Sequence, residues 1–112
     1  MLQSLISLIQ NMAFLQSLRN IRLSGDSTLL AECLKHDGTY TFSDLDLDTS
    51  IGNNKGHFDT SSTEYSRSAT NVKLSDTMLS ADLLRSNAPS LHDSIDLNTI
   101  VANHDGVLAF QK

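Results

Sequence analysis

The sequence contains an imperfect internal repeat, and this feature constrains its fold more than any other. Residues 20–58 read NIRLSGDSTLLAECLKHDGTYTFSDLDLDTSIGNNKGHF, and residues 71–108 read NVKLSDTMLSADLLRSNAPSLHDSIDLNTIVANHDGVL. With one residue deleted in the second copy, the matched positions include Asn20 with Asn71, Ala31 with Ala81, Asp46 with Asp96, Asn53 with Asn103 and Gly56 with Gly106. A period of about 50 residues indicates one supersecondary unit used twice. Two copies are too few for an open solenoid, so we expect them to close on each other and to repeat any site that one copy builds.

Both copies show the alternation of apolar and polar residues that is typical of β-strands. Leu45 and Leu47 alternate with aspartates, and Ile95 and Leu97 alternate with polar residues in the second copy. This period of two places one face of a strand in a core and the other in water. Further strands are predicted at residues 20–23, 29–34, 71–74 and 79–84.

Turns are predicted between these strands, where glycine, asparagine and aspartate cluster. These residue types tolerate the left-handed φ that tight hairpin turns require, and they occupy residues 24–26, 36–38, 53–56 and 103–106. Single helical turns are predicted at residues 48–51 and 98–101, each beginning at a capping residue. The segment 59–68 is predicted to be a linker anchored by Tyr65, and Pro89 is assigned to a loop at residues 86–90.

Length and charge limit the domain count and the class of partner. The 112 residues suffice for one compact domain, which we divide into an N-terminal extension at 1–13, repeat 1 at 14–62 and repeat 2 at 63–112. The formal net charge is −5, and the chain has no cluster of Lys and Arg residues. Such a surface repels polyanions, so neither nucleic acid nor a membrane surface is an expected partner.

The residues that could carry catalysis or bind a metal form no recognisable set. Cys33 is the single cysteine, so it cannot form an internal disulfide, and we interpret it as a small buried hydrophobe. The four histidines do not have the spacing of a zinc site, and no metal or cofactor is expected. Asp and Glu residues are spread along the strands without a Ser-His-Asp or Cys-His pattern, so the chain is predicted not to be an enzyme.

The first residues, MLQSLISLIQNMAF, superficially resemble an export signal. They lack a positive n-region, and no small-residue cleavage site follows them. The apolar stretch is also too short to span a membrane. We therefore expect a cytoplasmic or non-classically secreted protein, and we assign no function to the extension.

Two motifs in the first copy give a resemblance to a known family. They are A-E-C-x-x-x-x-G-x-Y at residues 31–40 and L-D-L-D-x-x-I-x-N-x-x-G-x-F at residues 45–58. With their counterparts in the second copy, they resemble the cyanovirin-N homology family of carbohydrate-binding proteins, and Met12-Ala13-Phe14 resembles the usual beginning of fungal members. The resemblance covers residues 14–110 and implies a lectin rather than an enzyme. It also implies an all-β, pseudo-twofold fold, in which each lobe has a three-stranded sheet, short helical turns and a β-hairpin contributed by the other repeat.

The same resemblance implies two saccharide sites. The first, built by the start of repeat 1 and the end of repeat 2, would use Gln16, Ser17, Leu34, His36, Asp37, Asn103 and Asp105. The second would use Asn53, Lys55, Thr63, Glu64, Ser68 and Ser86. Family members usually have Asp where Lys55 stands, and lysine cannot accept a hydrogen bond, so the second site is expected to be weaker or inactive. The implied partners are mannose-containing or related oligosaccharides and glycoproteins of the high-mannose type.

Other departures from the family concern stability and assembly. The cysteine pairs of its founding member correspond here to Leu18 with Cys33 and to Ala69 with Leu83, so neither pair can form a disulfide. The founding member's hinge proline corresponds to Ser62. A monomer is expected, and a domain-swapped dimer is the alternative.

The sequence leaves two questions open, one about the function and one about the turn residues. The chain is either a lectin or an interaction module that keeps the fold and has lost sugar binding. Asn53, Asn103 and Asp37-Gly38 are either turn formers alone or also sugar contacts. Because the chain has no Trp and only 5% aromatic residues, recognition of a sugar is expected to depend on hydrogen bonds rather than stacking.

Overall fold

The computed structural model describes residues 17–111, so the predicted extension and the site residue Gln16 lie outside the described residues. Antiparallel β-hairpins dominate this part of the chain, and its helical elements are single 3-10 turns. The strands of repeat 1 are β1 (Leu18–Ser24), β2 (Thr28–Leu34), β3 (Tyr40–Asp46), β4 (Gly52–Asn54) and β5 (His57–Asp59). Those of repeat 2 are β6 (Ala69–Ser75), β7 (Met78–Arg85), β8 (Ala88–Asp96), β9 (Val101–His104) and β10 (Val107–Phe110). The 3-10 turns are η1 (Leu47–Thr49), η2 (Tyr65–Ser68) and η3 (Leu97–Thr99).

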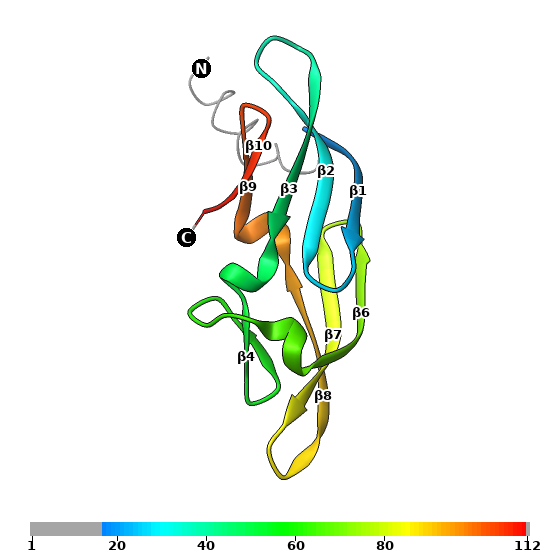
Figure 1. The fold of residues 1–112 in the computed structure, drawn as a ribbon, viewed down its shortest axis with the longest axis vertical. Helices are drawn as coiled ribbons and strands as arrows, with labels where there is room; N and C mark the ends of the chain where they lie inside the picture. The colour runs from blue at the N-terminus through cyan, green and yellow to red at the C-terminus, as the bar shows by residue number, and fades with distance from the viewer. Residues whose placement is uncertain (1–16, 112) are drawn as a thin grey trace, which may run out of the picture.

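Each lobe combines a sheet from one repeat with a hairpin from the other. The sheets have the orders β1-β2-β3 and β6-β7-β8, and the hairpins are β4-β5 and β9-β10. The β9-β10 hairpin packs beside β3, where the Leu108 N–H donates to the Ser43 hydroxyl at 3.1 Å (Figure 1). In the other lobe, the Phe58 N–H of β5 donates to the Asp93 carboxylate of β8 at 2.9 Å. The predicted all-β pseudo-twofold fold with exchanged hairpins is therefore confirmed, in an elongated body of 53 × 28 × 20 Å.

The cross-strand registers of the two sheets repeat each other closely. Leu18 pairs with Cys33 between β1 and β2, and Ala69 pairs with Leu83 between β6 and β7. These are the positions at which the resemblance implied lost disulfides. Cys33 is fully buried with a free thiol, and its burial raises the pKa of that thiol, so it is the small hydrophobe expected from the sequence.

The core forms where the buried faces of the two repeats meet. It includes Leu29, Leu47 and Ile51 from repeat 1 and Leu79 and Leu97 from repeat 2, all fully buried. Alternate residues along β2 and β7 are buried, as the period of two predicts. A core shared in this way ties the two lobes together.

Tyr65 anchors the segment between the repeats, as predicted. Its side chain is fully buried, its ring meets Phe58 edge-on at 5.5 Å, and its hydroxyl donates to the Asp26 carbonyl oxygen. Burial raises the pKa of the phenol well above its ordinary value. The segment is more ordered than a simple linker, however, because η2 occupies residues 65–68.

The predicted helical turns are present, but each begins one residue earlier than the sequence predicted, and its capping residue lies two positions earlier. The side chains of Asp46 and Asp96 accept from the backbone N–H groups of Asp48 and Asn98, each at 3.0 Å, and so cap η1 and η3. The aspartate before each buried leucine ends the strand, because its side chain offers the following N–H groups a local partner. No helix in the described part of the chain is long and apolar enough to cross a membrane.

Pro89 lies in a strand, not in the loop that the sequence predicted. Strand β7 extends to Arg85, which pairs with Ala88 of β8, so only Ser86 and Asn87 form the turn. β8 is an edge strand of its sheet, and Pro89 is its second residue. A proline is tolerated there because an edge position does not need its missing N–H.

Candidate functional site

The side chain of Asn103 joins three segments at the end of the first lobe. Its Nδ2 donates to the Leu34 carbonyl oxygen at 2.9 Å and to the Ser17 hydroxyl at 3.1 Å, and its Oδ1 accepts from the Gly106 N–H at 2.8 Å. The residue before β1, the end of β2 and the β9–β10 turn therefore meet at one amide group. Both amide hydrogens are used within the protein, so Asn103 shapes this end of the lobe.

Neither Asn53 nor Asn103 has the left-handed backbone that the turn-former interpretation assumed. The left-handed residues of these turns are Lys55 and Asp105, with φ values of 54° and 49°, and the glycines that follow them. Asn53 and Asn103 lie in β4 and β9 and stabilise the turns through their side chains. The Asn-x-x-Gly pattern did locate the turns correctly, because the amide oxygen caps the glycine N–H.

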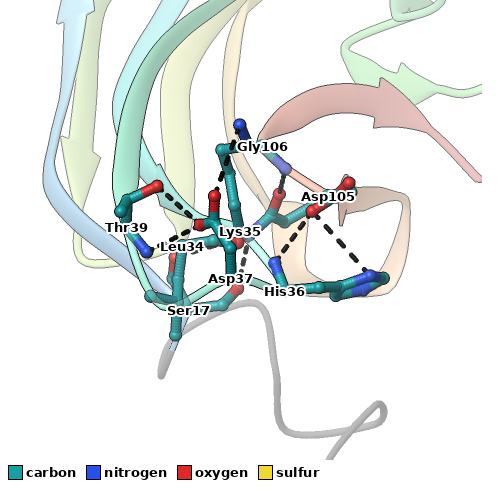
Figure 2. Close-up of polar contacts among 9 residues, drawn as sticks. Ser17, Leu34, Lys35, His36, Asp37, Thr39, Asp105 and Gly106 are labelled. Carbon is teal, nitrogen blue, oxygen red and sulfur yellow. Dashed lines mark hydrogen bonds and ion pairs between the residues drawn. The ribbon is translucent and has the colours of Figure 1, made fainter.

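Asp105 connects the β9–β10 turn to the β2–β3 turn. Its Oδ1 accepts from the His36 N–H at 2.8 Å and lies 3.8 Å from the His36 Nδ1 atom. Figure 2 shows Asp105 and His36 facing each other, with Ser17 the lowest labelled residue in the view. The side chains of His36 and Asp105 are 89% and 54% exposed, so both remain accessible to a ligand. Since both contacts use Oδ1, the Oδ2 atom meets no hydrogen-bond donor within residues 17–111.

Asp37 closes the β2–β3 turn. Its Oδ1 accepts from the Thr39 N–H at 2.9 Å and from the Thr39 hydroxyl at 2.6 Å, and its Oδ2 lies 3.9 Å from the Lys35 ammonium. The hydrogen bonds from Thr39 hold the pKa of Asp37 below its ordinary value. Asp37 therefore has the structural role expected for an Asp-Gly turn. Lys35 and Thr39 were not singled out in the sequence, although an Asp two residues before a Thr is a signal for this closure.

The second lobe repeats the arrangement around Asn53. Its Nδ2 donates to the Ser68 hydroxyl at 2.9 Å and to the Leu84 carbonyl oxygen at 2.8 Å, and its Oδ1 accepts from the Gly56 N–H at 2.8 Å. Ser68 and Leu84 match Ser17 and Leu34. The structure therefore confirms that the hydrogen-bond network around Asn103 recurs in the other lobe, as the repeat predicted.

The turn glycines allow close packing against the neighbouring sheet. A Cβ on Gly106 would lie 2.6 Å from Thr41 Cγ2, and one on Gly56 would lie 2.8 Å from Leu91 Cδ1 and 2.9 Å from Arg85 Cδ. Both glycines also have left-handed φ values, of +95° and +91°. No other residue type fits these positions without strain or movement of the neighbouring side chains.

An open pocket of about 540 Å³ lies in the second lobe. It is lined by Asn53, Lys55, Ser68, Leu84, Arg85, Ser86 and Ala88. Four predicted site residues are thus brought together, whereas Thr63 and Glu64 are not part of the lining. Glu64 forms an ion pair with Arg67 at 3.4 Å. The sequence prediction did not name Arg85, although it matches Lys35 in the repeat.

Histidines and acidic residues pair on the surface without forming a metal site. His57 Nδ1 lies 3.9 Å from the Asp93 carboxylate, and His92 Nδ1 lies 3.0 Å from the Asp82 carboxylate. Between residues 17 and 111, no group of three or more His, Cys, Asp or Glu residues could hold a metal ion.

Comparison with known proteins places these features in a family. The CVNH domain model matches residues 14–109. A curated Cyanovirin-N homolog from Tuber borchii is 42% identical over 64 residues, an alignment that covers 56% of this chain and 62% of that protein. The match thus spans less than two thirds of the length of this relative.

Solved structures share the fold over nearly their whole length. A designed Cyanovirin-N homolog lectin is 34% identical with a TM-score of 0.81, covering 88% of this chain and 98% of the designed one. The CVNH of Gibberella zeae is 32% identical with a TM-score of 0.80, covering 87% of this chain and 95% of that protein.

Two more distant structures were solved as saccharide complexes. Microvirin with mannobiose is 20% identical with a TM-score of 0.75, covering 88% of this chain and 97% of that chain. The MoCVNH3 variant with (N-GlcNAc)4 is 21% identical with a TM-score of 0.77, covering 86% of this chain and 95% of that chain. At these identities the likeness is one of fold alone. Because the family model spans both repeats and solved members above 30% identity share the fold, this chain belongs to the CVNH domain family.

Proposed function

We propose that this protein is a non-enzymatic lectin that binds mannose-containing or related oligosaccharides, mainly through the first-lobe site. That site consists of Ser17, Leu34, His36, Asp37, Asn103 and Asp105. The observation that carries the proposal is the Asp105 carboxylate, which is held by the His36 N–H through one oxygen while the other oxygen meets no described donor. Family membership supports a carbohydrate ligand, and two proteins of the same fold were solved with oligosaccharides, mannobiose in one and (N-GlcNAc)4 in the other.

The geometry suits recognition of adjacent sugar hydroxyls. A hydroxyl both donates and accepts, so a site needs both functions a short distance apart. The Asp105 carboxylate accepts, and the exposed imidazole of His36 donates or accepts according to its tautomer. Asn103 fixes the positions of the surrounding segments before the sugar arrives, which lowers the ordering cost of binding. The ligands we expect are oligosaccharides, free or on high-mannose glycoproteins.

The second candidate function is an interaction module that has lost sugar binding. Lys55 supports the loss of neutral-sugar binding in the second lobe, but it says nothing against the first lobe. At this position the first lobe has Asp105, which accepts from the His36 N–H. A lysine in the same left-handed position offers no acceptor to a neutral sugar. We therefore assign the neutral-sugar site to the first lobe.

The test is a residue-resolved titration of the full chain with α-linked mannobiose. In the amide NMR spectrum, we expect shifts at Ser17, His36, Asn103 and Asp105 and none at Asn53 or Ser68. Shifts confined to the second lobe would overturn the site assignment. If no amide responds to mannobiose or to any sugar on a glycan array, the proposed lectin function is wrong and the second candidate stands.

A further inference from the structure

The two lobes differ sharply in charge at matched positions. In the first lobe the matched positions hold Lys35, Asp37 and Asp105, which are one cation and two carboxylates, and Lys35 lies 3.9 Å from Asp37. In the second lobe the corresponding residues are Arg85, Asn87 and Lys55. The repeat has thus replaced both carboxylates and kept only cations, in a chain whose net charge is −5.

The two cations of the second lobe line the same pocket and lack a partner of opposite charge. Within residues 17–111, neither Lys55 nor Arg85 forms an ion pair, whereas Lys35 lies 3.9 Å from Asp37 and Arg67 lies 3.4 Å from Glu64. Arg22 and Lys73 also form no ion pair in this part of the chain, but neither of them lines the pocket, whereas Lys55 and Arg85 line it together. Solvent and salt weaken the attraction of Lys55 and Arg85 for an anion, but no ion pair with a carboxylate neutralises either charge.

The Arg85 side chain is held in place over the pocket. Its Nε donates to the Pro89 carbonyl oxygen at 2.7 Å, and its stem packs against Gly56, where an added Cβ would lie 2.9 Å from Cδ. The terminal guanidinium nitrogens are left to bind a ligand. A held guanidinium matches the paired oxygens of a carboxylate, sulfate or phosphate group and loses little entropy on binding them.

The remaining lining fits a sugar ring better than a bare anion. Ser68 and Ser86 supply hydroxyls, Leu84 and Ala88 supply apolar surface, and the pocket volume of about 540 Å³ exceeds the need of a small ion. The amide hydrogens of Asn53 are already used, as are those of Asn103. Neutral hydroxyls would therefore meet the serines while the anionic group meets Lys55 and Arg85.

From these features we infer that the second-lobe pocket binds an acidic saccharide, a sugar ring that carries a carboxylate, sulfate or phosphate group. This inference rests on the proposed carbohydrate-binding function and assigns a different ligand class to the second lobe. Lys55 is then a change of specificity rather than the loss of a site. The overall negative charge of the protein disfavours long polyanions, so a sugar with one or two charges is the expected ligand.

The test compares matched sugars on the labelled full chain. The probes are methyl α-mannoside, its 6-sulfate, its 6-phosphate and the corresponding methyl mannosiduronate, with inorganic sulfate as the anion alone. At low salt we expect the charged rings to shift the amides of Asn53, Lys55 and Ser86 with an affinity at least about tenfold above that of the uncharged ring, because hydrogen bonds to charged groups are the stronger ones. The three charged rings distinguish a carboxylate from an ester as the preferred group. Equal affinity for charged and uncharged rings, inorganic sulfate binding as tightly as the charged rings, or no shift with any probe would overturn the inference.

Variants separate the pocket from the general surface charge. We expect Lys55→Gln to weaken the charged ring about tenfold, while Lys73→Gln, an equal charge change on β6 outside the pocket lining, has no effect. An equal loss in both variants would show that the effect is one of overall charge and would overturn the inference. The mannobiose titration reads first-lobe amides and the charged-ring titration reads second-lobe amides, so failure of the lectin function and failure of the acidic site are distinguishable.

Discussion

The backbone N–H of His36 donates to the Asp105 carboxylate at 2.8 Å, although 69 positions separate the two residues in the chain. The bond joins a turn of repeat 1 to a turn of repeat 2, so the first-lobe site belongs to neither repeat alone. Its geometry depends on the exchange of hairpins that builds both lobes (Figure 1). A change at this site is therefore expected to affect ligand binding and, in some cases, lobe assembly.

Replacing Asp105 with alanine is expected to abolish mannobiose binding at the first lobe. The substitution removes the free acceptor and the cap on the His36 N–H, at a cost of about 1.5–3 kcal/mol for a hydrogen bond to a charged group. Isothermal titration calorimetry should show a loss of at least about tenfold in affinity. Asp76→Ala is the matched control, because Asp76 also has a left-handed φ, of 53°, but lies outside the site. Unaltered affinity in Asp105→Ala would contradict the site assignment.

Asn103→Ala is expected to destabilise the fold as well as the site. It leaves the Leu34 carbonyl, the Ser17 hydroxyl and the Gly106 N–H without this amide, and a lost partner costs about 1–3 kcal/mol. Urea unfolding followed by circular dichroism should show a lower midpoint. Asn53→Ala should lower it by a similar amount, because its three bonds are equivalent. A midpoint unchanged in both variants would show that the amides do not hold the turns.

Lys55→Asp is expected to give the second lobe a neutral-sugar site. The new carboxylate would stand where Asp105 stands in the first lobe, with the Ser86 N–H in the place of the His36 N–H. Calorimetry with mannobiose should then show two sites per chain in place of one. A stoichiometry that stays at one would mean that other second-lobe residues, such as Arg85, also prevent neutral binding.

Leu18→Cys is expected to form a disulfide with Cys33. The two positions are cross-strand partners between β1 and β2. A disulfide that closes a loop of about 15 residues stabilises the folded protein by roughly 3 kcal/mol. Thermal unfolding should occur at a higher temperature under oxidising conditions and return to the lower value after reduction. The control is Ala69→Cys. The cross-strand partner of this position is Leu83, which has no thiol, so no disulfide can form there. Equal unfolding temperatures in the oxidised and reduced Leu18→Cys protein would contradict the prediction.

The contribution of Asp37 to stability is expected to depend on pH. Hydrogen bonds from Thr39 hold the folded-state pKa of Asp37 below the ordinary value of 3.8. A lowered pKa means that the carboxylate stabilises the fold above that ordinary value, and that this contribution is lost as the pH falls through the lowered pKa. Asp37→Asn should therefore lower the free energy of unfolding near neutral pH and match the parent protein in strong acid. A difference that stays constant across this range would exclude the ionised carboxylate as its source.

The fold was predictable because its main determinants are periodic or local. Alternation located the long strands, and glycine-containing turns located the hairpins. The single helical turns were predicted, but their caps were placed two residues late, because Asp46 and Asp96 cap through side-chain bonds that alternation does not reveal. Pro89 was misassigned because a proline is tolerated only when the strand lies at an edge, and an edge is a property of the assembled sheet.

The candidate site was less predictable, because its contacts span both repeats. The resemblance implied both Asn103 and Asp105 as sugar contacts. It did not reveal that both amide hydrogens of Asn103 bond within the protein, whereas one carboxylate oxygen of Asp105 meets no donor in residues 17–111. Arg85 was not singled out within its loop, because its importance lies in its placement over Gly56 and its lack of an ion pair. Neither property can be read from a residue type or its spacing.

The exchange of hairpins also means that a cut between the two repeats would divide both lobes. The first lobe takes β1 to β3 from repeat 1 and β9 and β10 from repeat 2, and the second lobe takes β6 to β8 from repeat 2 and β4 and β5 from repeat 1. A fragment that ends between β5 and β6 therefore contains no complete lobe, and both fragments are needed to rebuild either ligand site.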